Sequence, residues 1–207
     1  MNRCRILSAA CLGAALIFSS CGKKDDAAVE LLPSPSSSAP KTLSKYWPLP
    51  EFTLTERSGK QVTLADFAGK VWVADFIYTS CPGPCPALTS RLSGVQKALG
   101  NDPRVRLVSI TVDPDKDTPE VLKAYAEKFG AGESWLFLTG KKDALFSLSR
   151  DGFKLPVAEP TAEAALVHST RLILVDKTGT VRGFYEGTDD AGLAELVNDI
   201  RKLVEEK

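Results

Sequence analysis

Residues 71–92 read VWVADFIYTSCPGPCPALTSRL, and they carry two structural signals in succession. Val71 to Tyr78 is a nearly continuous apolar run of strand-forming residues, which is typical of a central strand covered on both faces. Apolar residues then recur at helical spacing, at Leu88, Leu92, Val95 and Leu99. The pattern predicts a strand followed by a helix, with Cys81 and Cys85 at the junction between them.

The rest of the chain around this segment predicts an α/β sheet. Upstream, two short strands on either side of Arg57–Lys60 predict a β-hairpin. Downstream, strands are expected over 104–112, 135–138, 172–175 and 181–185, and helices over 118–129, 142–150 and 193–204. We therefore expect an α/β fold with a central mixed β-sheet flanked by helices and with an N-terminal β-hairpin.

The N-terminus carries an export signal. Arg3 and Arg5 precede an apolar run from Ile6 to Phe18, which is too short for a transmembrane span of about 20 residues. The run ends in Phe18-Ser19-Ser20-Cys21, which resembles a bacterial lipobox although Phe18 replaces the usual Leu. We expect residues 1–20 to be a lipoprotein signal peptide and Cys21 to be lipidated, on the extracytoplasmic (periplasmic) face of a bacterial membrane. An uncleaved anchor, or cleavage without lipid, stays open.

Composition separates a tether from a folded domain. Residues 21–44 are charged and then rich in Pro, Ser and Ala without an apolar period, which predicts a disordered tether. Residues 45–207 form the expected globular domain, which has a usual single-domain size. The chain has 26 basic and 26 acidic residues, so it lacks the excess of positive charge that would indicate a nucleic-acid partner.

The chain has five cysteines, but few of them belong to the folded domain. Cleavage would remove Cys4 and Cys11, and lipidation would block Cys21, which leaves Cys81 and Cys85 as thiols. Two cysteines are too few for a disulfide scaffold, so an exported pair indicates redox or metal chemistry. A passive disulfide between them would close a very short loop and stabilise little, and it remains an alternative.

The Cys-x3-Cys spacing suits a metal site. Residues four apart lie on one side of a helix, so Cys81 and Cys85 can direct both sulfurs to one point if the loop turns into helix at Pro82 or Pro84. The helix N-terminus then favours thiolate. His168 is the only histidine; a lone histidine is more often a surface residue, but this one stands shortly before the strand at 172–175. Two thiolates and one imidazole make a three-coordinate Cu(I) site that can admit Cu(II) with an added ligand, while zinc stays chemically open.

Three blocks of sequence carry a family resemblance. They are Phe76–Pro86, Ser109–Pro119 and Val167–Ser169, and together with their spacing they resemble the Sco/SenC family of copper chaperones. The resemblance implies a thioredoxin-like fold with copper bound by Cys81, Cys85 and His168. It also implies copper donor proteins as partners and help in building the copper site of cytochrome c oxidase subunit II, or of another copper protein. A thiol-reductant role toward that subunit is implied as well.

Two acidic residues also match a pattern of that family, and two other positions differ from it. Asp113 and Asp117 match a recurring acidic pair, to which the resemblance assigns support of the site or of partner contacts; strand-end solvation and helix capping are equally open roles. Gly83-Pro84 lies where many relatives carry Asp-Val. Val167 replaces a common acidic residue, which leaves the imidazole without an identified partner.

Other functional classes fit less well. A thiol-disulfide oxidoreductase of this fold generally has Cys-x2-Cys and a cis-proline, whereas here the spacing is x3 and His168-Ser169-Thr170 stands where the proline would be. A thiol peroxidase using Thr79 and Cys81 would need a different pattern after Thr79. We therefore expect a metallochaperone rather than an enzyme, with a membrane-anchored thiol-disulfide oxidoreductase as the alternative.

Overall fold

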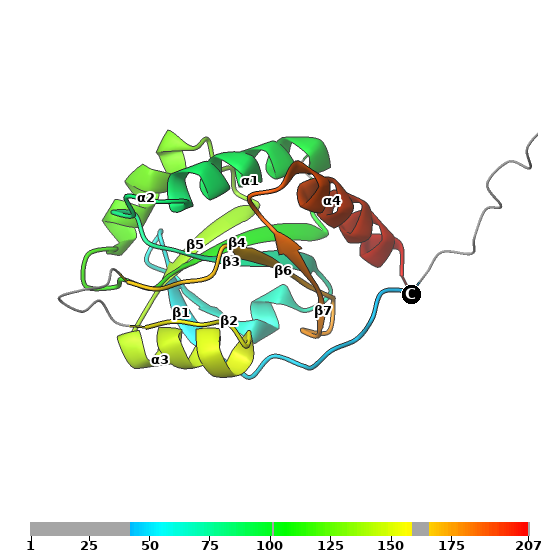
Figure 1. Cartoon of the computed structure of the whole chain (residues 1–207). Coiled ribbons are helices and arrows are strands. Elements are labelled where there is room, and N and C mark those ends of the chain that lie inside the picture. The colour runs from blue at the N-terminus through cyan, green and yellow to red at the C-terminus, as the bar shows by residue number, and fades with distance from the viewer. Residues whose placement is uncertain (1–41, 101, 159–165, 207) are drawn as a thin grey trace, which may run out of the picture. The chain divides into compact units, whose positions relative to one another are not determined.

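The computed structural model describes residues 42–100, 102–158 and 166–206 (Figure 1). The expected signal peptide, the lipidation site at Cys21 and most of the expected tether lie outside the described residues. Ala39–Lys207 forms one compact unit. Within the described residues, no helix combines the length and the apolar character that crossing a membrane requires.

A seven-stranded mixed sheet lies at the centre of this unit, in the order β2-β1-β5-β4-β3-β6-β7. β3 pairs in parallel with β4 and antiparallel with β6, so the strand that leads to the cysteines lies inside the sheet. Every residue of β3 is buried, and the predicted central mixed sheet is confirmed. The strands are β1 (Thr53–Glu56), β2 (Gln61–Thr63), β3 (Val71–Ile77), β4 (Val105–Thr111), β5 (Trp135–Thr139), β6 (Arg171–Val175) and β7 (Val181–Glu186).

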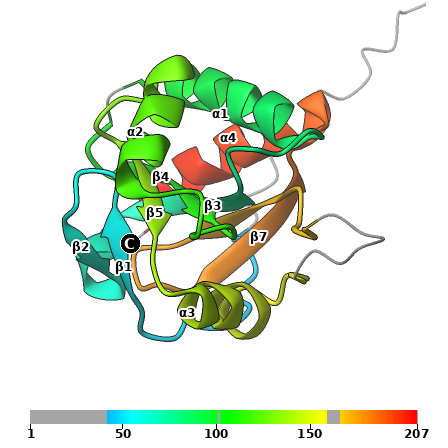
Figure 2. The ribbon, with the colours of Figure 1, turned by 90° about the vertical axis from the view of Figure 1, so that its left-hand side faces the viewer.

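Helices cover both faces of the sheet (Figures 1 and 2). α1, α2 and α4 pack on one face, and α3 packs on the other. Because side chains alternate along a strand, β3 contributes to both cores: Val73 and Ile77 face the three helices, while Trp72 and Phe76 face α3. The helices are α1 (Cys85–Leu99), α2 (Pro119–Lys128), α3 (Lys142–Ser147) and α4 (Asp190–Glu205).

The turn between β1 and β2 contains a glycine with a positive φ. β1 and β2 pair antiparallel around a turn in which Gly59 has a φ of 85°, a backbone conformation that favours glycine.

The segment expected to be one helix over 142–150 ends as an α-helix at Ser147 and continues as a wider π-type turn over Leu148–Gly152. The indole Nε1 of Trp47 donates to the carbonyl of Gly152 at 2.7 Å, which satisfies a backbone oxygen at the end of this turn.

The first described residues run along the start of the edge strand β7. We call residues 43–49 the N-terminal strap. Tyr46 N donates to Val181 O, and Val181 N donates to Trp47 O, both at 2.9 Å. These bonds pair backbone groups that an edge strand would otherwise leave open.

Arg182 fixes the strap to the domain. Its guanidinium is 1% exposed and donates to the carbonyls of Leu43 and Ser44, while it forms ion pairs of 2.9 Å with Asp176 and Glu206. These contacts begin two residues upstream of the boundary expected at residue 45.

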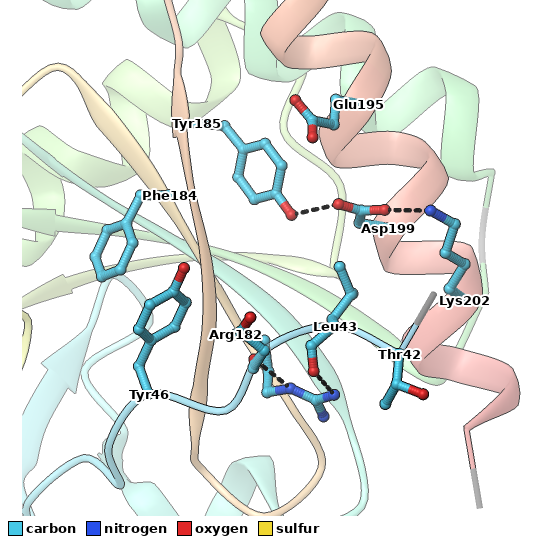
Figure 3. A pocket seen from close by; sticks show the side chains of 10 residues that line it. Thr42, Leu43, Tyr46, Arg182, Phe184, Tyr185, Glu195, Asp199 and Lys202 are labelled. Atoms are coloured by element: carbon cyan, nitrogen blue, oxygen red, sulfur yellow. Dashed lines mark hydrogen bonds and ion pairs between the residues drawn. The ribbon is translucent and has the colours of Figure 1, made fainter. Parts of the chain in front are cut away.

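An open pocket of about 320 Å³ lies between the strap, β7 and α4 (Figure 3). Asp199 is the buried carboxylate in its wall, and it accepts hydrogen bonds from the Tyr185 hydroxyl at 2.8 Å and from Lys202 Nζ at 2.7 Å. Arg182 is likewise paired within the chain. The buried charges of this pocket therefore need no ligand, and the pocket contains neither the cysteines nor the histidine.

Candidate metal centre

The loop after β3 and the first turn of α1 hold the two cysteines. Cys81 lies four residues beyond the end of β3, and Cys85 is the first residue of α1. Pro86 lies in the first helical turn, where its missing N–H removes no helical hydrogen bond. Both cysteines are free thiols and are buried, while residues 82–84 between them are exposed. The sulfurs are therefore covered, while the loop that joins them is open to solvent.

The structure brings His168 to the cysteines. The imidazole Nε2 lies 2.9 Å from Cys85 Sγ, and one ligand atom from each of Cys81, Cys85 and His168 lies within 4.8 Å of the other two. His168 precedes β6, which pairs with β3, so the sheet carries the histidine to the end of the strand that leads to the cysteines. The three residues singled out from the sequence thus form one cluster.

A backbone carbonyl orients the imidazole. His168 Nδ1 lies 3.0 Å from the carbonyl oxygen of Ser169. A carbonyl oxygen only accepts hydrogen bonds, so Nδ1 carries a proton, and in the neutral ring Nε2 keeps a free lone pair toward the sulfurs. Metal-ligating histidines are held by this kind of outer hydrogen bond. The sequence left this partner unidentified, because a main-chain acceptor has no signature in side-chain types.

Tyr78 packs on the cluster and was not singled out from the sequence. Its ring stands at 89° to the imidazole of His168, with ring centroids 5.3 Å apart. Burial, followed by a hydrogen bond with Cys81, raises the pKa of the Tyr78 hydroxyl to about 12. Tyr78 therefore stays a neutral donor beside the sulfur, and its ring limits the rotation of the imidazole.

The two thiols differ in acidity. Burial alone would raise the pKa of Cys81, but hydrogen bonds with Cys85, His168 and the backbone of Gly83 outweigh it and lower that pKa to about 6. Burial, and then the hydrogen bond with Cys81, raise the pKa of Cys85 well above its ordinary value. At neutral pH the pair thus holds one thiolate, at Cys81, and one thiol, at Cys85.

Asp117 braces the loop that carries Cys81. Its carboxylate is fully buried and accepts hydrogen bonds from the backbone N–H of Thr79 at 3.0 Å, from the Thr79 hydroxyl and from the Thr111 hydroxyl. The helix cap of α2 is Thr118, whose hydroxyl accepts from Val121 N. The capping role left open for Asp117 therefore belongs to its neighbour.

Asp113 lies nearer the surface than Asp117. Its carboxylate forms an ion pair of 3.0 Å with the exposed side chain of Lys116. It also acts electrostatically on the Tyr78 hydroxyl, where its charge contributes to the raised pKa. The two acidic residues therefore have different contacts: Asp117 bonds to the cysteine loop directly, and Asp113 pairs with an exposed lysine.

Comparison with known proteins agrees with this geometry. Residues 42–205 match the SCO1/SenC family. The chain belongs to this family. The match covers the whole described fold and leaves out the N-terminal region that precedes the strap.

Solved SCO1/SenC structures share the fold. A SCO1/SenC family lipoprotein from Bacillus anthracis is 35% identical, with a TM-score of 0.71 over 76% of this chain and 95% of its own. BsSco, described as having a disulfide switch and as a member of the Sco family of cytochrome c oxidase assembly proteins, is 30% identical, with a TM-score of 0.71 over 81% and 98%. Copper-bound ScoI from Bradyrhizobium japonicum is 26% identical, with a TM-score of 0.65 over 75% and 99%. The expected thioredoxin-like fold is confirmed.

The donor set of this SCO1/SenC chain fits a soft metal ion. Two sulfurs and one imidazole nitrogen converge, and the cluster that holds them contains no carboxylate. Thiolate sulfur prefers Cu(I) to hard cations, and the imidazole suits both oxidation states of copper.

Proposed function

We propose that this chain is a copper metallochaperone that carries copper as cargo and helps to assemble the copper site of cytochrome c oxidase. The observation that carries the proposal is the convergence of Cys81, Cys85 and His168 within 4.8 Å, beyond the end of β3 and beside the exposed loop at 82–84. Relatives support it, because ScoI from Bradyrhizobium japonicum holds copper and BsSco belongs to a family of cytochrome c oxidase assembly proteins.

The acidities of the two thiols suit loading and release of a cation. Cys81 is the thiolate at neutral pH and makes the first contact with the cargo, next to the exposed loop at 82–84. Cys85 gives up its proton on binding, so loading is coupled to proton release. Release of the ion returns that proton to Cys85.

A thiol-disulfide role is the second candidate, and the unequal thiols favour it. The Cys81 thiolate attacks one sulfur of a partner disulfide and forms a mixed disulfide, which expels the other partner sulfur as a thiolate. Cys85 then loses its proton and attacks the Cys81 sulfur, which frees the second partner thiolate. Two electrons pass to the partner, and Cys81 and Cys85 end as a disulfide. The disulfide switch described for BsSco supports this candidate.

We also propose that Cys21 is lipidated and that the residues between Cys21 and the strap tether the domain to the extracytoplasmic face of a bacterial membrane. The support is the lipobox-like sequence before Cys21 and the likeness to a family lipoprotein of Bacillus anthracis. Palmitate labelling in a bacterial host tests this, since a Cys21→Ser variant should lose the label and the membrane association.

The test of the cargo is copper retention under anaerobic conditions. We expect one tightly held copper per reduced chain and loss of that copper in Cys81→Ser and Cys85→Ser. Relative to the unchanged protein, His168→Ala should weaken Cu(II) binding more than Cu(I) binding. Ser80→Ala, an exposed neighbour in the same loop, is the matched control and should behave as the unchanged protein.

Two outcomes would redirect the assignment. If the reduced, unchanged protein retains no copper, the oxidoreductase reading takes its place, and the potential of the cysteine pair becomes the quantity to measure. If copper is held but does not appear on the soluble copper domain of an oxidase subunit II after mixing, another copper protein is the acceptor.

A further inference from the structure

A buried carboxyl lies on β3, the strand that leads to the cysteine loop, and it has no part in the function described above. Asp75 is on β3 and is 1% exposed. Val73 and Ile77, two residues before and after it, face α1, α2 and α4, so Asp75 lies on the same face of the strand. Its Oδ1 accepts from the Ser109 hydroxyl at 2.6 Å, but its Oδ2 is buried without any partner among the described residues. Such an oxygen costs stability, because water no longer solvates it.

Local structure explains the oxygen that is bonded but not the charge. Trp135 Nε1 donates to Ser109 Oγ at 2.9 Å, so the Ser109 hydroxyl must donate its own hydrogen onward, and Asp75 Oδ1 receives it. An amide oxygen would accept this bond equally well. The packing therefore requires an acceptor at position 75, whereas the second oxygen makes no hydrogen bond within the described part of the chain.

Three titratable groups interact electrostatically with this charge, and two of them belong to the metal centre. From α1, Cys85 interacts unfavourably with a negative Asp75. From the segment before β6, His168 interacts favourably with it. From α2, Tyr125 is a third group affected, and its hydroxyl is held 3.0 Å from that of Thr89. Asp75 is thus buried on the face of β3 that packs on α1, the helix that begins with Cys85, and its charge acts on two of the three candidate ligands.

We propose that Asp75 is a positioning residue of the metal centre, whose buried negative charge favours Cu(II) over Cu(I) and the Cys81–Cys85 disulfide over the dithiol. The inference rests on the proposed copper function for its first half. A negative charge stabilises the more positive of two metal states. It also disfavours negative charge on the reduced cysteine pair, which oxidation to the disulfide removes.

The first test compares Asp75→Asn with the unchanged full chain loaded with copper at pH 8. At that pH the carboxyl, whose pKa burial raises to about 7, is ionised. In equilibrium with a ferricyanide–ferrocyanide couple, the ratio of Cu(I) to Cu(II) should rise on the order of tenfold in the variant, equivalent to about 59 mV for one electron. A change below twofold would overturn the inference.

The second test needs no copper. The full chain is equilibrated in glutathione buffers, quenched by alkylation and digested with trypsin, and the peptide 71–91, bounded by Lys70 and Arg91, contains only the cysteines Cys81 and Cys85. Asp75→Asn should retain more dithiol at each glutathione ratio, again by on the order of tenfold in the equilibrium constant. Equal curves for variant and unchanged protein would contradict the proposed charge effect.

Matched controls separate charge from packing. Asp199→Asn makes the same change at another buried carboxyl, in the Tyr185–Lys202 cluster of Figure 3, and should leave both equilibria unchanged. If Asp199→Asn shifts them as much as Asp75→Asn, the effect is general and the inference fails. Asp75→Ser, a second neutral variant, serves in place of Asp75→Asn if the amide does not fold.

The outcomes also separate this inference from the proposed function. If the unchanged protein holds no copper but its disulfide equilibrium shifts in Asp75→Asn, the copper function fails, and with it the first half of the inference, while the effect of Asp75 on the thiol pair stands. If copper is held normally and neither equilibrium moves, the copper function stands and the role of Asp75 is disproved.

Discussion

The carboxylate of Asp117 accepts hydrogen bonds from both the backbone N–H and the hydroxyl of Thr79. Thr79 lies two residues before Cys81, and Asp117 lies two residues before the first residue of α2. The bonds therefore join the loop that carries the thiolate to the loop that opens the next helix. Since both loops follow neighbouring parallel strands, β3 and β4, the sheet itself sets the spacing of this contact.

Removing that carboxylate should loosen the cysteine loop. Asp117→Ala leaves the Thr79 N–H and two hydroxyls without their acceptor in a buried site, so we expect a loss of about 3 kcal/mol in unfolding free energy. Urea denaturation measures this. Asp115→Asn is the control, because Asp115 is an exposed residue of the same loop. An Asp117→Ala protein as stable as the control would show that the bonds to Thr79 contribute little.

The reactivity of Cys81 should follow its acidity. The alkylation rate of the reduced protein should rise with pH to half of its maximum near pH 6, because hydrogen bonds outweigh burial and lower the pKa of Cys81 to about 6. Mass spectrometry of peptide 71–91 reports the modified residue. In His168→Gln the midpoint should move upward, since one of these hydrogen bonds changes. A midpoint near the ordinary thiol value of about 8.5 would contradict this assignment.

Asp75 should make stability depend on pH. Burial raises its folded-state pKa from 3.8 to about 7, so its favourable contribution is present below pH 4 and is lost as the pH rises toward 7. Asp75→Asn should therefore differ little from the unchanged protein at pH 4 and be more stable at pH 8, by up to roughly 4 kcal/mol. Denaturant curves at both pH values check this, and a constant difference between the two would disprove it.

The N-terminal strap should depend on Arg182. Arg182→Met leaves Asp176 buried without its cation and the carbonyls of Leu43 and Ser44 without a donor, so we expect a loss of about 3 kcal/mol and faster tryptic cleavage after Lys45. Arg171→Met, which removes an exposed pair with Glu186, should cost no more than about 1 kcal/mol. Equal cleavage after Lys45 in both variants would mean that the strap is held by its backbone bonds alone.

The sequence predicted the parts of this protein that depend on periodicity and on rare residue types. The apolar run before Cys81 and the helical spacing after Cys85 determine the strand and the helix, and a single histidine limits the choice of imidazole. The Ser169 carbonyl and the buried bonds of Asp117 were not predictable in the same way. They depend on which loops the sheet brings together, and a main-chain acceptor or a buried carboxylate looks the same in sequence as a solvated one.

The position of the strap has a mechanical consequence. β7 and β3 run in the same direction, because each is antiparallel to β6. The strap binds the first residue of β7, whereas Cys81 follows the last residue of β3, so the chain enters the domain at the pole opposite to its thiols. Any force transmitted through the residues upstream of the strap pulls on that far pole. The load therefore enters the domain at the contact between the strap and β7 and not at the cysteine loop.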